Sequence, residues 1–278
     1  MSSGNNSNTF VVIDDENHYY EKNEDLKENM KNKPTAVDIE LLVDRSGSMN
    51  TMIKQTINGV HEFIESQKHN AKTTGIKTII TIKTFDNIVE TMEGFNGKDI
   101  LNTTDMDDSV LQPRGTTRLI DTVCEAIIEQ NRRYSDYKKY NSNGNMCRII
   151  AVLTDGGDNQ SKLFSKDNMK DLIEKHRKNG LVAMFLAANQ DAINEGSKMG
   201  FSPEHAMTYT PYGDYANNAF RSLSTQIILA SNGEDNTGFT DLQRTMSAGQ
   251  TVQHNYLPGD VNNFKNNKPS QSTKLTRC

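Results

Sequence analysis

Three separated stretches of the chain place oxygen-bearing side chains beside apolar runs. They are Asp44-Arg45-Ser46-Gly47-Ser48, Pro113-Arg114-Gly115-Thr116-Thr117 and Thr154-Asp155-Gly156-Gly157. Two carboxylates brought together where apolar strands end would repel each other and lose hydration. A divalent cation relieves both costs, and serine and threonine hydroxyls are suitable neutral ligands for Mg²⁺ or Mn²⁺. The residue types therefore predict a divalent-metal site built from oxygen ligands.

The elements that must position these stretches lie between residues 35 and 231, where short apolar runs alternate with amphipathic stretches of helical length. Strands are predicted over 36–43, 76–85, 88–92, 147–154, 181–188 and 206–209, and helices over 51–70, 118–133, 166–178, 191–199 and 215–231. The turn signal Asp86-Asn87 predicts that 88–92 runs back beside 76–85. We expect an α/β, Rossmann-like open sheet of about six strands, mostly parallel with one antiparallel edge strand, and helices on both faces.

In such sheets, ligands bind at the carboxyl ends of the strands, near the point where strand order reverses. The stretches that begin at Asp44 and Thr154 each follow a predicted strand, and Thr117 precedes a predicted helix. In this order and context, Asp44-x-Ser46-x-Ser48, Thr117 and Thr154-Asp155-Gly156 resemble the metal ion-dependent adhesion site of von Willebrand A domains. The resemblance covers roughly residues 35–231. It extends to 186–193 and 218–223, which are similar to cytoplasmic members from bacteria and their viruses.

The resemblance implies two different roles for five residues. Ser46, Ser48 and Thr117 would touch the metal directly, while Asp44 and Asp155 would hold its water molecules. All five positions keep the expected residue type, so the resemblance implies an intact site. One coordination position would stay open for an Asp or Glu of a partner protein, which implies a binding module and not an enzyme. In some family members the last helix, here 215–231, moves when a ligand completes the metal shell.

Three residues next to the predicted ligands are candidates for partner contact. Arg45 occupies a variable position inside the first stretch, Met49 follows it directly, and Asp158 extends the third stretch. For Asp158 the alternative is an ordinary solvated loop residue. For the first stretch as a whole, the alternative is a helix-capping cluster before residue 51.

Two other functions compete with metal-dependent binding. One is a Mg²⁺-dependent hydrolase or phosphotransferase with Asp44 as nucleophile. Against it, Ser46 stands where the familiar aspartyl-phosphate pattern has a second acid, and the sequence has neither a Gly-x-Ser-x-Gly elbow nor a Gly-x-x-x-x-Gly-Lys loop. The other is a scaffold whose tails carry the interactions, with the apolar run Phe10-Val11-Val12-Ile13 as a docking segment.

Composition predicts polar tails on both sides of the domain. Residues 1–34 are expected to form a disordered arm, and residues 232–278 a disordered tail. There is no signal peptide and no apolar run near the roughly 20 residues needed to span a bilayer, so we expect a cytoplasmic protein without membrane contact. The net charge of -5 gives no case for nucleic-acid binding, and three cysteines without ligand spacing argue against disulfides and zinc. The sequence sets no oligomeric state.

Overall fold

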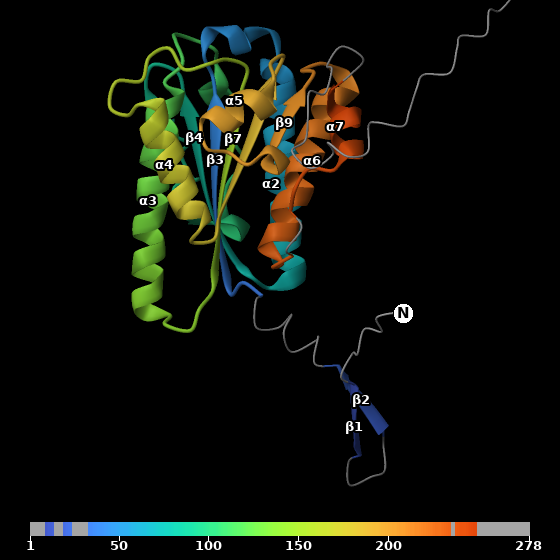
Figure 1. Cartoon of the computed structure of the whole chain (residues 1–278). Coiled ribbons are helices and arrows are strands. Elements are labelled where there is room, and N and C mark those ends of the chain that lie inside the picture. Colours follow the sequence, from blue (N-terminus) through green and yellow to red (C-terminus); the bar gives the residue numbers. More distant parts are fainter. Residues whose placement is uncertain (1–8, 14–18, 24–32, 235–236, 249–278) are drawn as a thin grey trace, which may run out of the picture.

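The computed structural model describes residues 9–13, 19–23, 33–234 and 237–248 of the chain, with side chains for the last two ranges. Its main element is a seven-stranded sheet, with helices on both sides (Figure 1). The strands of this sheet are β3 (Ala36–Asp44), β4 (Lys77–Phe85), β5 (Val89–Thr91), β6 (Lys98–Asp99), β7 (Met146–Thr154), β8 (Leu181–Ala188) and β9 (Ala206–Tyr209). A separate antiparallel pair consists of β1 (Thr9–Ile13) and β2 (Tyr19–Asn23).

The helices follow the strands in alternation. They are α2 (Ile53–Thr74), α3 (Leu119–Tyr140), α4 (Lys166–Arg177), α5 (Ala192–Lys198), α6 (Gly213–Ser231) and α7 (Asp241–Ala248). Short 3-10 turns are η1 (Gly47–Thr51), η2 (Ile100–Asn102), η3 (Asp108–Leu111) and η4 (Pro203–His205). The α/β sheet with helices on both faces, predicted from the sequence, is confirmed.

The strand order is β5-β4-β3-β7-β8-β9, and β3, β4, β7, β8 and β9 run parallel. The antiparallel strand expected after Asp86-Asn87 is β5, which pairs with the end of β4. The sequence did not reveal β6, which pairs antiparallel with Ile79 and Ile80 of the same strand. With only two residues, β6 is too short to carry an alternating pattern.

Two apolar layers fill the space between sheet and helices. On one face, residues such as Ile39 and Leu41 of β3 pack with α2 and α6. On the other face, Leu42 and its neighbours pack with α3, α4 and α5. Figure 1 shows α3 and α4 on one side of the sheet and α2 and α6 on the other. Strand β3 is buried along its whole length, as expected for a central strand.

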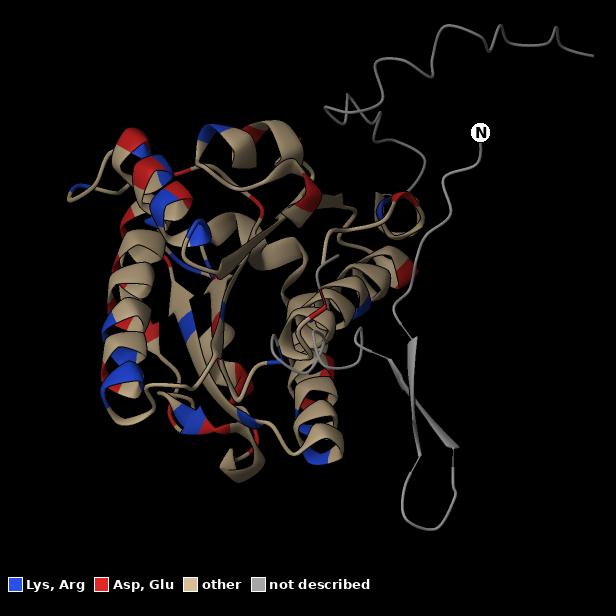
Figure 2. Cartoon of the chain, turned by 60° about the horizontal axis from the view of Figure 1, so that its bottom comes forward, with Lys and Arg blue, Asp and Glu red and all other residues tan. Residues whose placement is uncertain are grey.

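Buried charges interrupt the α3 side of this core. Asp38 and Glu40 of β3 are fully buried, and Arg133 of α3 donates to both carboxylates, with 2.9 Å from its Nε to Asp38 Oδ2. Lys83 of β4 is also ion-paired with Glu40, at 2.8 Å. Figure 2 shows blue and red segments on the central strands. Burial raises the pKa of both carboxyls even though these cations oppose the shift.

The segment after residue 231 differs in part from the predicted disordered tail. Helix α7 packs on α6 and β9, and its Arg244 is buried. The guanidinium of Arg244 donates to the carbonyls of Pro203, Glu204, Ala206 and Phe239. The packed face of α7 consists of Arg244, Ser247 and Ala248, while Leu242 and Met246 are exposed, so apolar spacing in the sequence does not mark the buried face of this helix. Residues 249–278 lie outside the described part of the chain, and the domain limits remain a prediction.

Within the described residues, no helix combines the length and apolar character needed to cross a bilayer.

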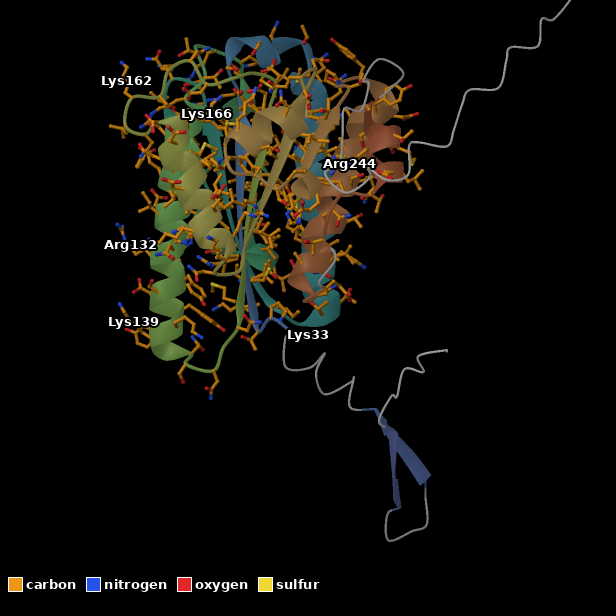
Figure 3. All side chains as sticks on the ribbon, viewed as in Figure 1. Lys33, Arg132, Lys139, Lys162, Lys166 and Arg244 are labelled. Carbon is orange, nitrogen blue, oxygen red and sulfur yellow. The ribbon has the colours of Figure 1, made fainter. Side chains whose placement is uncertain are left out.

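We expect Arg133→Met to destabilise the fold, because it leaves Asp38 and Glu40 buried with fewer cationic partners. The free energy of unfolding should fall by about 3 kcal/mol, measured by urea denaturation at pH 7. The matched control is Arg132→Met, since Arg132 is exposed and projects outward from α3 (Figure 3). Equal effects of the two substitutions would show that the buried ion pairs do not contribute to stability.

Candidate metal site

The predicted site lies where the strand order of the sheet reverses. After β3 the chain crosses to β4 on one side, and it later returns to β7 on the other side of β3. Asp44 ends β3 and Thr154 ends β7, and the Thr154 hydroxyl donates to Asp44 Oδ2 at 2.6 Å. The carboxyl ends of these two parallel strands are therefore in direct contact, at the position where α/β sheets bind ligands.

The loop after β3 places the polar side chains of Ser46 and Ser48 next to this contact. The backbone N–H of Ser46 donates to Asp44 Oδ1 at 2.7 Å, and η1 begins immediately after Ser46. The hydroxyls of Ser46 and Ser48 lie 3.2 Å apart, and that of Ser48 donates to Asp155 Oδ1 at 2.7 Å. Four of the five predicted ligands are thus linked by hydrogen bonds, with Asp44 buried and Ser48 exposed.

Thr117, the fifth predicted ligand, is held between the other two loops. On one side, Gly47 N donates to Gly115 O at 3.3 Å. On the other side, the N–H groups of Asn159 and Gln160 donate to Thr117 O at 3.0 and 3.1 Å. The Thr117 N–H in turn donates to Asn159 Oδ1 at 2.8 Å. The structure therefore brings all three predicted loops together.

Gly115 allows the close approach of the Thr117 loop. Its φ of +67° lies in the left-handed region, which favours glycine. A Cβ at this position would also lie 2.4 Å from Asn87 Oδ1. A larger residue here would push the loop away from the turn after β4.

The electrostatics of the site favour a cation. Burial raises the pKa of Asp44 to about 6, the charge of Asp155 adds to the shift, and hydrogen bonds from Thr154 and Ser46 oppose it. Burial also raises the pKa of Asp155. Within the described residues, neither carboxylate forms an ion pair with Lys or Arg. These two acids therefore share a site without a protein cation, and a bound metal ion would stabilise both in the charged form.

The donor set fits a hard divalent cation. It consists of hydroxyl and carboxylate oxygens only, which suits Mg²⁺ or Mn²⁺ better than it suits zinc. Within the described residues, no group of three or more His, Cys, Asp or Glu side chains could hold a metal by itself. Metal binding here would therefore depend on the hydroxyls of Ser46, Ser48 and Thr117.

Tyr209, at the end of β9, is a further polar group near the site that the sequence did not reveal. Its side chain is buried and, among the described residues, its hydroxyl has no hydrogen-bond partner. Burial raises the pKa of this hydroxyl, and the charges of Asp155 and Asp44 raise it further, so all three groups are close enough to interact. Tyr209 ends a short edge strand that carries no acidic or serine-rich motif, so the sequence did not signal this position.

Arg45 does not lie where partner contact requires it. Its side chain is buried, and Nε donates to Asp86 Oδ2 at 3.0 Å. Arg114 Nε donates to the same oxygen at 2.7 Å, and both guanidiniums also pair with Glu90. Although burial opposes it, the N–H of Ile88 and the two arginines hold the pKa of Asp86 below its usual range. Asp86 was predicted to serve the turn, and in the structure it also links the Arg45 and Arg114 loops.

The other two candidates for partner contact are also turned inward. Met49 is fully buried in the core layer beside α2. Asp158 is half-buried and accepts hydrogen bonds from Ile120 N at 3.1 Å and from the Ser161 hydroxyl. Its side chain therefore fixes the loop to the start of α3. The geometry does not support direct partner contact by Arg45 or Met49, and it gives Asp158 a structural role.

Comparison with known proteins gives similarity at the level of the fold. No family model matches the chain, and neither does any curated protein. The solved structures that resemble it include von Willebrand A domains, abbreviated VWA. Its fold is similar to theirs. The SpRpn10 VWA domain is 12% identical, with 68% of this chain and 95% of that one covered and a TM-score of 0.46.

Two further similar structures are of chains that this protein covers only in part. One is proximal thread matrix protein 1 from the mussel byssus, solved with a zinc-occupied metal ion-dependent adhesion site (MIDAS) motif. It is 16% identical over 81% of this chain and 47% of that one, with a TM-score of 0.42. The manganese-loaded TRAP protein of Plasmodium vivax is 20% identical over 55% and 57%, with a TM-score of 0.38. The chain thus spans about half the length of the mussel protein.

We expect Asp44→Asn to stabilise the metal-free protein at neutral pH. The pKa of Asp44 in the folded state, about 6, exceeds its ordinary value of 3.8, so the folded state binds the proton more tightly than the unfolded chain does. The stability that this proton contributes is complete below pH 4 and is lost as the pH rises through 6. At pH 7 in chelator, the amide should raise the free energy of unfolding by about 2 kcal/mol.

Urea denaturation at pH 5 and pH 7 checks this, with Asp136→Asn on the exposed part of α3 as the control. A destabilising effect of Asp44→Asn at pH 7 would contradict the assignment of Asp44 as an uncompensated buried charge.

We expect Arg114→Gln to weaken metal binding roughly tenfold, because outer residues that orient a metal site commonly contribute this much to affinity. Loss of a positive charge near the site would by itself strengthen cation binding, so a decrease can arise only from a displaced Thr117 loop. Isothermal titration with Mn²⁺ measures the change, Arg114→Lys should recover part of the affinity, and Arg132→Gln is the charge-matched control. Tighter binding in Arg114→Gln would rule out a positioning role.

Proposed function

We propose that the chain is a metal-dependent protein-binding module. Ser46, Ser48 and Thr117 would hold a divalent cation, Mg²⁺ or Mn²⁺, and an Asp or Glu of a partner protein would complete its coordination. The observation that carries the proposal is the pair Asp44 and Asp155: two carboxylates of raised pKa that accept hydrogen bonds from Ser46 and Ser48 and, among the described residues, form no ion pair with Lys or Arg.

The arrangement supports different roles for the two kinds of oxygen. Hydroxyl ligands are neutral, so they would leave most of the positive charge on the metal and favour attraction of a partner carboxylate. Asp44 lies underneath, with both oxygens already accepting hydrogen bonds from Ser46 N and Thr154 Oγ1. In that position it would hold metal-bound water. The exposed Ser48 marks the side from which a partner would approach.

The same contacts argue against Asp44 as a nucleophile. A nucleophilic carboxylate must present one oxygen to the substrate, yet Asp44 is fully buried and both its oxygens are engaged. A hydrolase or phosphotransferase is therefore the weaker alternative. A scaffold with active tails remains the other alternative, because residues 1–8, 14–18, 24–32 and 249–278 lie outside the described structure. A cytoplasmic location likewise stays a prediction.

The metal is tested first, by thermal unfolding and titration calorimetry of the full chain with Mg²⁺ and Mn²⁺. A ligand present at about 100 times its Kd stabilises the folded state by about 2.7 kcal/mol. We expect such stabilisation in the wild type and its loss in the double variant Ser46→Ala, Ser48→Ala. The double variant Ser66→Ala, Ser135→Ala on the surfaces of α2 and α3 should behave as the wild type. Absence of metal binding in the wild type would refute the proposal.

A further inference from the structure

Three exposed apolar side chains lie in loops at the same edge of the sheet as the proposed metal site. Ile88 is 45% exposed, Leu163 is 65% exposed and Tyr212 is 52% exposed. Ile88 lies in the turn after β4, Leu163 in the loop after β7 and Tyr212 in the loop after β9. Since these strands are parallel, all three loops emerge at the carboxyl edge of the sheet, the upper edge in Figure 1. We call these three residues the apolar rim.

Asp44 and Asp155 follow strands that lie between the strands preceding Ile88 and Tyr212. In the strand order β4-β3-β7-β8-β9, the ends of β3 and β7 carry Asp44 and Asp155, and Ile88 and Tyr212 follow the strands on either side. Strands are about 4.8 Å apart, so β4 and β9 are separated by about 19 Å. This distance corresponds to roughly six residues of an extended peptide, and it fits within one side of an ordinary protein interface.

Hydrogen bonds hold the loop that carries Leu163. The fully buried carboxylate of Asp121 accepts hydrogen bonds from three consecutive N–H groups, those of Lys162 at 2.9 Å, Leu163 at 3.0 Å and Phe164 at 2.9 Å. Asp121 lies in the first turn of α3, close in sequence to Thr117. Leu163 is therefore presented to solvent from a fixed backbone that is linked to the metal loops.

The other two rim residues also extend from anchored backbone. Ile88 N donates to Asp86 Oδ1 at 2.8 Å, and Arg118 N donates to Asp86 O at 2.8 Å. Tyr212 caps the start of α6, two residues after Thr210, whose N–H donates to Ser247 O at 2.9 Å. Anchored loops lose little conformational entropy on binding, so apolar contacts on them contribute efficiently to affinity.

The positive charge beside Leu163 favours an acidic partner segment. Lys162 precedes Leu163, has no ion pair among the described residues and extends from its loop (Figure 3). Asp86 and Glu90 are paired with arginines and Asp121 accepts from backbone N–H groups, whereas Asp191 and Asp214, after β8 and β9, are exposed and form no ion pair among the described residues. A metal ion at the centre and a free ammonium at the margin would both attract carboxylates.

We propose that the apolar rim recognises an extended segment of a partner protein in which a central Asp or Glu has apolar residues on both sides within about six positions. The central carboxylate binds the metal, and the flanking side chains contact Ile88, Leu163 and Tyr212. This inference rests on the proposed metal-dependent function, and it defines which acidic segments the site accepts.

The probe is a displayed library of random twelve-residue peptides with a fixed central Asp, selected on the full chain in Mg²⁺. We expect the selected peptides to carry apolar residues on both sides of the Asp and to be released by chelator. The substitutions Ile88→Ser, Leu163→Ser and Tyr212→Ser should each weaken the best peptide about fivefold to tenfold, with unchanged Mn²⁺ affinity.

Each variant has a control of the same residue type that is also exposed and lies away from this edge. Ile128→Ser on α3, Leu101→Ser in η2 and Tyr140→Ser at the end of α3 should change peptide affinity less than twofold. Metal-dependent peptides without flanking apolar residues, or equal losses in rim and control variants, would overturn the rim and leave the proposed function intact. Equal selection by wild type and the Ser46→Ala, Ser48→Ala variant, or no selection by either, would count against both.

Discussion

Asp44 carries a carboxylate into the fully buried end of β3, where it contacts Thr154 of β7 and the backbone of Ser46. These bonds join the two strands between which the sheet order reverses. They also set the direction in which residues 45–48, the serine loop, leave β3. The loss of hydration at Asp44 is only partly offset by two neutral donors, so its pKa stays high. The burial of Asp44 thus determines both the position of the loops and the electrostatic cost of the site.

In other buried acids of this chain, the negative charge is balanced by protein cations or by backbone N–H groups. Asp38 and Glu40 have Arg133, Asp86 has Arg45 and Arg114, and Asp121 has three backbone N–H groups together with Arg118. Asp86 and Asp121 have a lowered pKa, whereas burial keeps the pKa of Asp38 and Glu40 raised despite their cations, as it does for Asp44 and Asp155. Among the described residues, Asp44 and Asp155 differ from these four acids in forming no ion pair with Lys or Arg.

The sequence predicted the sheet and the meeting of three polar loops because both follow from local patterns. Apolar runs mark parallel strands, and residues that follow such strands share one edge. Side-chain direction was not predictable in this way. Arg45 and Met49 lie beside predicted ligands in sequence, but Arg45 turns inward to reach Asp86, and Met49 enters the core from η1. Tyr209 and α7 were missed for a related reason: their contacts join segments distant in sequence.

Apolar packing connects the site to α6. The Tyr209 ring meets the Phe220 ring of α6 edge-on, with centroids 6.4 Å apart. Phe220 in turn lies so close to Gly59 of α2 that a Cβ there would be 2.2 Å from the ring. Because α2 follows the serine loop through η1, a shift of that loop and a shift of α6 would both disturb the contact between Gly59 and Phe220. Bonds from Asn218 and Gln226 to α7 would resist such a shift, so any movement of α6 must also involve the helix that packs against it.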